Sequence, residues 1–198
     1  MTMHSKIGSF SYDDERARGG GHDPVIVSRK LASGLGELPV GLILSRDQAG
    51  AAVPYEAVAA EAIGAGDGTD KTFSATLAKH PVQPGSVAVS DGVEDFADDG
   101  LGRLTGDAGG SGTINYATGA VAVEFHAAPA NAAPVEAAYD RQFSGVLDEA
   151  VDTALSGAGL VIVHGSVRKD VLKVGVSAPA APSAALLGRM EDHGIWPV

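Results

Sequence analysis

The chain has 198 residues, a formal net charge of −11 and no cysteine. The lack of cysteine excludes disulfides, thiol catalysis and cysteine-ligated zinc, and the acidic balance argues against nucleic-acid binding, which needs clustered Lys and Arg. No apolar run approaches the ~18 residues of a membrane span, and residues 1–24 lack the apolar core of a secretion signal, so we expect no membrane partner and synthesis in a cytoplasm.

The N-terminal segment, residues 1–22, is polar and ends in the glycine run "RGGG". Such a composition cannot form a core, so it predicts a flexible arm. Ile7, Phe10 and Tyr12 are the bulky apolar residues of this arm, and we take them as candidates for anchoring it to a partner.

Residues 23–62 read as the start of a β-rich domain. The β-branched run "VIV" at 25–27 predicts one strand, and "LPVGLILS" predicts a second strand after a turn at 34–37. The alanine-rich "AVAAEAI" that follows fits either a helix or a third strand.

Residues 63–143 alternate apolar and polar side chains in "KTFSATL", "GSVAVSDG", "GTINYATGAVAVEF" and "PVEAAYDRQF". A period of two predicts strands with one buried face, and Gly119 closes a turn in which glycine accepts a positive φ. Several such strands separated by turns predict a small antiparallel β-sandwich. Its expected core residues are Phe73, Val87, Phe96, Ile114, Tyr116, Val121, Phe125 and Tyr139.

Residues 144–198 resemble residues 23–62 in composition and apolar pattern. "GLVIVHGSV" predicts a buried strand, and "PSAALLGRMEDHG" predicts a short helix with Ser183 as its N-cap and Gly194 just beyond its end. A further helix is expected in "VLDEAVDTAL", because its apolar residues have helical spacing: Leu147, Val151 and Leu155.

The order of these segments along the chain predicts an α+β, mainly β fold in three parts. A flexible arm covers 1–22, a small β-rich domain with short helices covers 23–62 plus 144–198, and an antiparallel β-sandwich insertion covers 63–143. Insertions are tolerated where an exposed loop brings two chain ends close together. Trp196, the only tryptophan, lies in the tail and is either a core residue packed against the last helix or an interface anchor.

Chemical sites are not predicted with any specificity. The glycine-rich "GAGDGTDKT" lacks the spacing of a phosphate-binding loop and precedes a strand, so no helix N-terminus is available there. His164 and Ser166 share a strand face but lack the context of a catalytic triad. We therefore predict no catalytic residue and no cofactor. Calcium binding stays open for an acidic segment without EF-hand order: Asp91, Glu94, Asp95, Asp98, Asp99 and Asp107.

Two resemblances to virus proteins add to this reading. The motifs "GAGDGTDKTFSATLAKHPVQPGSVAV", "DDGLGRLTG" and "GSGTINYATGAVAVEFHAAP" resemble a β-module found inside many tailed-phage structural proteins. The flanking "SRKLASG", "PVGLIL", "VIVHGSVRKDVL" and "PSAALLGRMEDHGI" are more distantly similar to the head decoration proteins of the phage lambda type, whose small members lack a mid-chain insertion.

The resemblance implies a non-enzymatic capsid cement. Such a protein forms a homotrimer at three-fold positions on the outer surface of the expanded head, and its N-terminal arm contacts the major capsid protein. In this picture Ile7, Phe10 and Tyr12 are the expected capsid-binding residues and Trp196 the expected interface residue. The alternative is a tail, fibre or adhesion component whose β-module binds a host glycan, and a calcium-dependent binding module is a further alternative.

Overall fold

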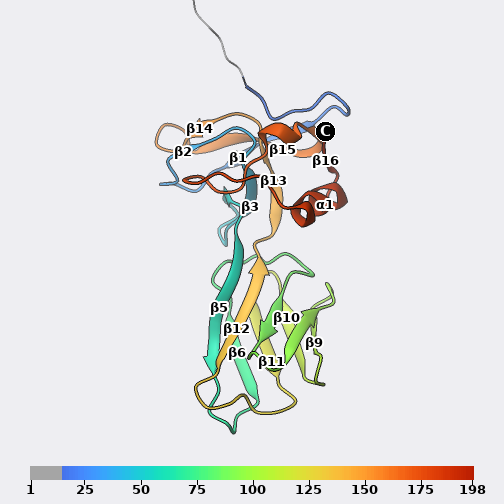
Figure 1. Ribbon diagram of the computed structural model, residues 1–198. Helices are drawn as coiled ribbons and strands as arrows, with labels where there is room; N and C mark the ends of the chain where they lie inside the picture. The colour runs from blue at the N-terminus through green and yellow to red at the C-terminus, as the bar shows by residue number, and fades with distance from the viewer. Residues whose placement is uncertain (1–14) are drawn as a thin grey trace, which may run out of the picture.

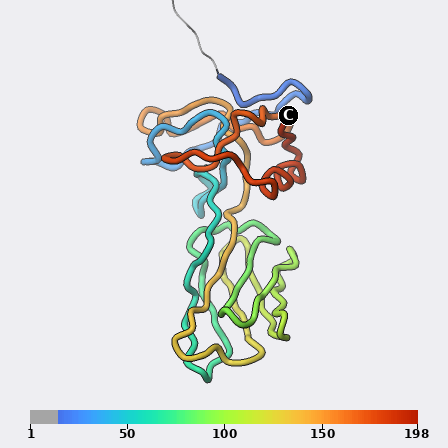
Figure 2. Tube along the Cα trace, in the orientation of Figure 1, coloured from blue at the N-terminus to red at the C-terminus, as the bar shows by residue number. Residues whose placement is uncertain are grey.

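A computed structural model describes residues 15–198, which form two lobes joined end to end (Figure 1). The terminal lobe comprises residues 15–54 and 143–198, and the central lobe comprises residues 57–140. The first described residues and the C-terminus lie at the same end of the molecule, away from the central lobe (Figure 2). Within the described part of the chain, the helices are too short to cross a membrane.

The terminal lobe is built on a six-stranded sheet with the order β1-β15-β13-β3-β4, and β16 pairs in parallel with β15. Strands that precede the central lobe in the sequence therefore pair with strands that follow it. The strands are β1 (Val25–Lys30), β3 (Ile43–Arg46), β4 (Ala52–Pro54), β13 (Phe143–Leu147), β15 (Ala158–Val167) and β16 (Ile195–Pro197). A small second ladder pairs β2 (Glu37–Leu38) with β14 (Val151–Asp152).

The central lobe is a single eight-stranded antiparallel sheet with the order β5-β12-β7-β8-β9-β10-β11-β6. Its two edge strands, β5 and β6, approach each other, so the sheet curls into a nearly closed barrel. Its strands are β5 (Ala57–Ala65), β6 (Thr72–Thr76), β7 (Ala88–Ser90), β8 (Asp95–Asp98), β9 (Arg103–Gly106), β10 (Ser111–Asn115), β11 (Ala120–Glu124) and β12 (Pro134–Asp140). The predicted two-sheet sandwich is therefore corrected to one curled sheet.

The alternating sequence pattern places one face of each central strand inside the barrel. In β11, Val121 and Val123 are buried while their neighbours are exposed, as period two requires. Of the eight expected core residues, six are buried, and Phe73 and Tyr116 pack at the margin. The β10–β11 hairpin turns at Gly119 with φ of +71°, as the sequence predicted.

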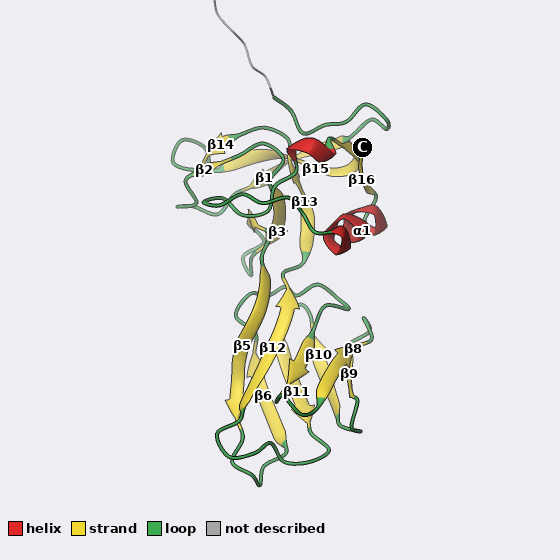
Figure 3. Ribbon diagram, viewed as in Figure 1, coloured by secondary structure: helices red, strands yellow, loops and turns green. Residues whose placement is uncertain are grey.

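Helical structure is confined to the C-terminal part of the described chain (Figure 3). A 3₁₀ turn covers Lys169–Val171, and α1 covers Ala184–Asp192. The hydroxyl of Ser183 accepts a hydrogen bond from the Leu186 amide at 3.2 Å, and Gly194 follows the helix with φ of +76°. Both predicted helix boundaries are thus confirmed.

The helix predicted for residues 146–155 is wrong. Leu147 ends β13, Val151 begins β14, and Leu155 is 87% exposed in the following turn. A spacing of four residues fits a strand face as well as a helix face, and pairing of β13 with β3 and β15 decides between them. The undecided "AVAAEAI" segment forms β5, which pairs with β12 in the central sheet although the prediction grouped it with residues 23–62.

Polar contacts connect the two lobes where the chain crosses between them. Arg189 of α1 forms an ion pair with Asp140 at the end of β12. The side-chain oxygen of buried Gln83 accepts a hydrogen bond from the Phe143 amide at 3.1 Å, and its side-chain nitrogen lies 3.5 Å from Nε2 of His193, the residue after α1. The helix therefore braces the central lobe against the terminal lobe.

Candidate functional site

The end of the terminal lobe that carries both described chain ends is the candidate interaction site. There, residues 15–22 of the expected flexible arm are packed against the sheet. Ala17 is fully buried in the core, and its amide donates to the backbone oxygen of Asp148 at 3.0 Å. Arg18 donates to the carboxylate of Asp148 from its backbone N at 3.2 Å and from Nε at 3.3 Å, and Nη2 completes the ion pair.

Asp148 is fully buried, and these partners offset the cost of removing its carboxylate from water. Arg16 adds an ion pair with neighbouring Glu149 at 2.6 Å, and Arg168 donates to the Arg16 carbonyl at 3.4 Å. Residues 16–18 are consequently part of the fold. Ile7, Phe10 and Tyr12 lie outside the described residues.

The glycine run 19–21 then crosses the surface of β15 and β16. The Gly19 amide donates to the Ser166 carbonyl at 2.8 Å, and a Cβ on Gly19 would lie 2.8 Å from Val198 Cγ2. A Cβ on Gly21 would lie 3.1 Å from the Ser166 hydroxyl oxygen. At Gly19 the lack of a side chain is therefore needed for close approach of the chain to the sheet.

Three aromatic rings meet beside this crossing. Trp196 lies 5.1 Å from His164 and 5.3 Å from His22 between ring centroids, and the two histidine rings are 5.2 Å apart. Ile195 points into the core, whereas Trp196 is 37% exposed. Val25 pairs with His164 across β1 and β15 and is exposed, as is the C-terminal Val198. We call His22, Val25, His164, Trp196 and Val198 the aromatic patch.

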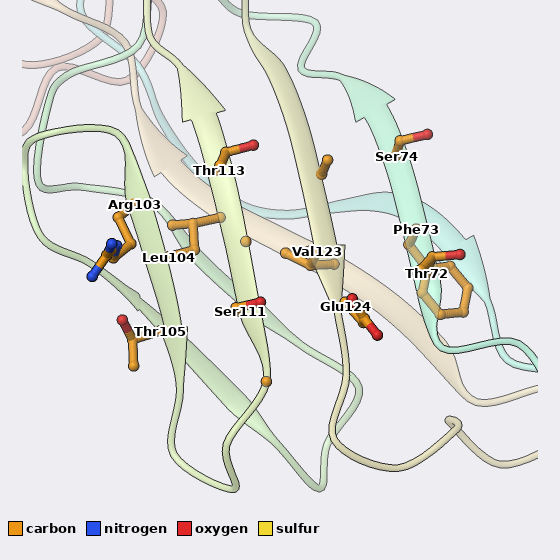
Figure 4. A pocket seen from close by; sticks show the side chains of 13 residues that line it. Thr72, Phe73, Ser74, Arg103, Leu104, Thr105, Ser111, Thr113, Val123 and Glu124 are labelled. Carbon is orange, nitrogen blue, oxygen red and sulfur yellow. The ribbon is translucent and has the colours of Figure 1, made fainter.

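The central lobe offers a different surface. A groove of about 680 Å³ runs over the outer face of β6, β11, β10 and β9 (Figure 4). Small side chains occupy its central positions, with Ala122 between Ser74 and Thr113 in adjacent strands. Arg103 and Glu124 supply the charged groups of the groove. The groove therefore presents hydroxyls and one charge of each sign.

The acidic segment 91–107 uses its carboxylates to hold turns. Four aspartates accept hydrogen bonds from backbone amides at 2.7–3.1 Å. In chain order these are Asp91 with the amides of Val93 and Glu94, Asp98 with Gly85, Asp99 with Leu101 and Arg103, and Asp107 with Asp95. The amides of Leu101 and Arg103 lower the pKa of Asp99. Over residues 15–198, His and acidic side chains form no cluster of three that could hold a metal ion.

Glu94 is the one acidic side chain of that segment that is buried. Its Oε1 accepts from the Gly110 amide at 2.6 Å, and its Oε2 accepts from the His126 amide at 2.8 Å. A Cβ on Gly106 would lie 2.2 Å from Oε1, so glycine leaves room for the carboxylate. Glu94 thus joins the turn before β10 to the end of β11.

Sequence reasoning missed the roles of Asp148, His22 and His164. The basic "RAR" before the glycine run indicated that residues 16–18 need an acidic partner, but no local pattern identifies that partner as the residue after β13, 130 residues away. Searched against protein families, curated proteins and solved structures, the chain matches none of them.

Proposed function

We propose that this protein is a non-enzymatic cement that decorates the outer surface of a phage capsid and stabilises the expanded head. The supporting observation is the separation of the molecule into two ends. One end carries residues 15–22, the C-terminus and the aromatic patch, and the other end is the central lobe (Figures 1 and 2). The first end faces the major capsid protein, and the central lobe projects outward.

The sheet topology supports treating the central lobe as an insertion in a decoration-type domain. The chain leaves the terminal sheet after β4 and re-enters it at β13. The two crossing segments are adjacent, because the Arg141 amide donates to the Glu56 carbonyl at 3.0 Å. An inserted lobe needs such closely spaced ends.

A homotrimer at three-fold positions accounts for firm attachment by small contacts. Each subunit contributes one arm and one patch, and linking three subunits raises the effective concentration of the second and third contacts. Residues 1–14, with Ile7, Phe10 and Tyr12, are the proposed capsid-binding segment. The partner is a protein surface, with no membrane and no nucleic acid involved. The protein is made in the host cytoplasm and acts on the virion.

The test is binding of purified protein to expanded, undecorated heads, measured by co-sedimentation and by cryo-electron microscopy. Removal of residues 1–14 should abolish decoration while leaving oligomeric state and circular dichroism unchanged. The cut stops at 14 because residues 16–18 neutralise buried Asp148. Full decoration by the truncated chain would refute the role of the arm.

A second candidate function is adhesion to a host glycan through the central lobe, favoured by the hydroxyl-lined groove. Replacing residues 57–140 with a short Gly-Ser linker separates the two functions, since the crossing points lie within one hydrogen bond of each other. Decoration by this variant supports the cement. Loss of decoration together with glycan-array binding by the full chain supports adhesion.

A further inference from the structure

We infer that the aromatic patch is the docking site for residues 7–12 of the same chain while the protein is free in solution. This inference goes beyond the proposed function and does not depend on it, because it concerns the isolated protein. The docked segment would bring Ile7, Phe10 and Tyr12 onto the exposed rings and aliphatic side chains of the patch.

The patch gathers exposed apolar side chains in one place, as expected of a surface that another segment covers. It collects three of the large apolar side chains that are exposed in the described chain, with exposed fractions of 49% for Val25, 37% for Trp196 and 62% for Val198. His22 and His164 fill the space between them as edge-on rings. Covering this area removes apolar surface from water, at about 25 cal/mol per Å².

The path of the chain identifies the occupant. Gly19 and Trp196 both lie opposite Ser166, one through a hydrogen bond at 2.8 Å and the other as its partner in the β15–β16 ladder. The N-terminal segment therefore passes beside the patch at Gly19, four residues after the first described residue, Glu15. Val198 is itself part of the patch, and its amide donates a hydrogen bond to the Val167 carbonyl at 2.8 Å.

The reach of the segment suffices. Residues 15–19 lead away from the patch over four residues, or about 14 Å if fully extended. Phe10 precedes Glu15 by five residues, which gives a reach of about 17 Å, and Ile7 can reach farther. Phe10 is therefore within reach of Trp196. The residues ahead of Glu15 include Ile7, Phe10 and Tyr12, whose apolar side chains can cover the patch.

The competing occupant is a second copy of the patch. A second copy must associate from solution, whereas a segment of the same chain is present at a high effective concentration. The two occupants differ in concentration dependence, so one experiment distinguishes them.

Trp196 is the only tryptophan, so its fluorescence reports the patch directly. The chain from residue 15 onward should show a red-shifted emission and acrylamide quenching increased by about twofold or more, as expected if the cover is closed in at least half of the molecules. In the full chain, Phe10→Ala with Tyr12→Ala should reproduce the truncation. Ser9→Ala with Ser11→Ala is the matched control and should leave quenching unchanged.

A second readout keeps the test independent of quenching. The chain has no cysteine, so Ser9→Cys provides a unique site for a nitroxide label, and the single indole N–H signal of Trp196 should broaden beyond detection. Adding Phe10→Ala and Tyr12→Ala should restore the signal. Unchanged quenching after truncation, or an unbroadened indole signal, overturns the inference. Emission that shifts on dilution equally in full and truncated chains assigns the patch to a second copy and also overturns it.

Discussion

Glu94 provides the sharpest test of whether the acidic segment is structural or binds calcium. Its buried carboxylate accepts one hydrogen bond from Gly110 and one from His126, and it thereby closes the barrel end where β9, β10 and β11 meet. If this role is correct, the variant Glu94→Ala should destabilise the central lobe, and calcium should have no effect on either protein.

The magnitude follows from the two amides. A buried donor left without a partner costs about 1–3 kcal/mol, which applies to the Gly110 amide, and the part-buried His126 amide adds less, so Glu94→Ala should lower the free energy of unfolding of the central lobe by about 2–4 kcal/mol. Glu94→Gln keeps one carbonyl acceptor but turns an NH₂ group toward the other amide, so its cost should be about 1–3 kcal/mol. A domain is typically stable by only 5–15 kcal/mol, so the alanine variant approaches unfolding.

The assay is urea unfolding followed by two probes. Far-ultraviolet circular dichroism follows both lobes, whereas Trp196 emission follows the terminal lobe alone, because the tryptophan lies in β16. Glu94→Ala should shift the circular dichroism transition to lower urea and move the tryptophan transition much less. Glu124→Ala removes an exposed carboxylate from β11 and is the matched control, expected to change stability by under about 0.5 kcal/mol.

Two outcomes would refute this reasoning. The structural role fails if Glu94→Ala unfolds within about 0.5 kcal/mol of the parent protein, which is the range of neutral surface substitutions. The calcium alternative gains instead if calcium raises, and a chelator lowers, the unfolding temperature of the parent but not of Glu94→Ala, because only a ligand of the native state does so.

Three further predictions concern the terminal lobe, the tyrosines and the junction. Arg18→Ala should destabilise the terminal lobe by about 2–3 kcal/mol, because it removes the closer of the two arginines paired with the buried Asp148 carboxylate and leaves Arg16 at 3.5 Å; an unshifted Trp196 unfolding transition would contradict this. Tyr116 and Tyr139 have pKa values raised to about 12, first by burial and then by a bonded carboxylate, so stability should be full below pH 10 and fall as pH rises from 10 through 12; ionisation of both phenols at pH 10, measured at 295 nm, would disprove the shift. Arg189→Ala should broaden the distribution of lobe orientations in small-angle X-ray scattering, whereas an unchanged profile would remove the helix from its bracing role.

Local signals made much of the central lobe predictable. The alternation around Thr72–Thr76 and Ala120–Glu124 fixed which side chains are buried, and Gly119 marked the hairpin by its tolerance of positive φ. Ser183 similarly marked the start of α1. Each of these features depends on neighbours within a few residues, so the sequence contains them directly.

Features decided by distant pairing were not predictable. Alanine-rich β5 has no strong local preference and becomes a strand because β12 pairs along it. Glu61 of β5 then accepts hydrogen bonds from the Ala78 amide and from the Tyr139 hydroxyl, which draws the two edges of the sheet together. Whether alternating strands form a sandwich or a barrel depends on such closure, and the alternation itself is the same in both.

The candidate site was predictable only in part, for the same reason. Trp196 stood out by its position and its uniqueness, but its ring partners His22 and His164 are separated by 142 residues of sequence, counting from 22 to 164. Arg18 and Asp148 likewise meet through an isolated bridge of the N-terminal segment to β15. The polar composition of residues 1–22 predicted a flexible arm, whereas Ala17 is buried and Arg18 binds Asp148, because the partners of this segment lie far away in the sequence.

The division into two lobes also explains why the sequence pattern changes along the chain. Their buried residues form separate apolar clusters, and the contacts between lobes are directional ones such as Arg189 with Asp140 and Gln83 with Phe143. Each core therefore constrains its own stretch of sequence, and the junction constrains only a few residues. Because the central lobe is held by a few polar contacts, substitutions in its outer groove can accumulate without disturbing the core beneath the aromatic patch.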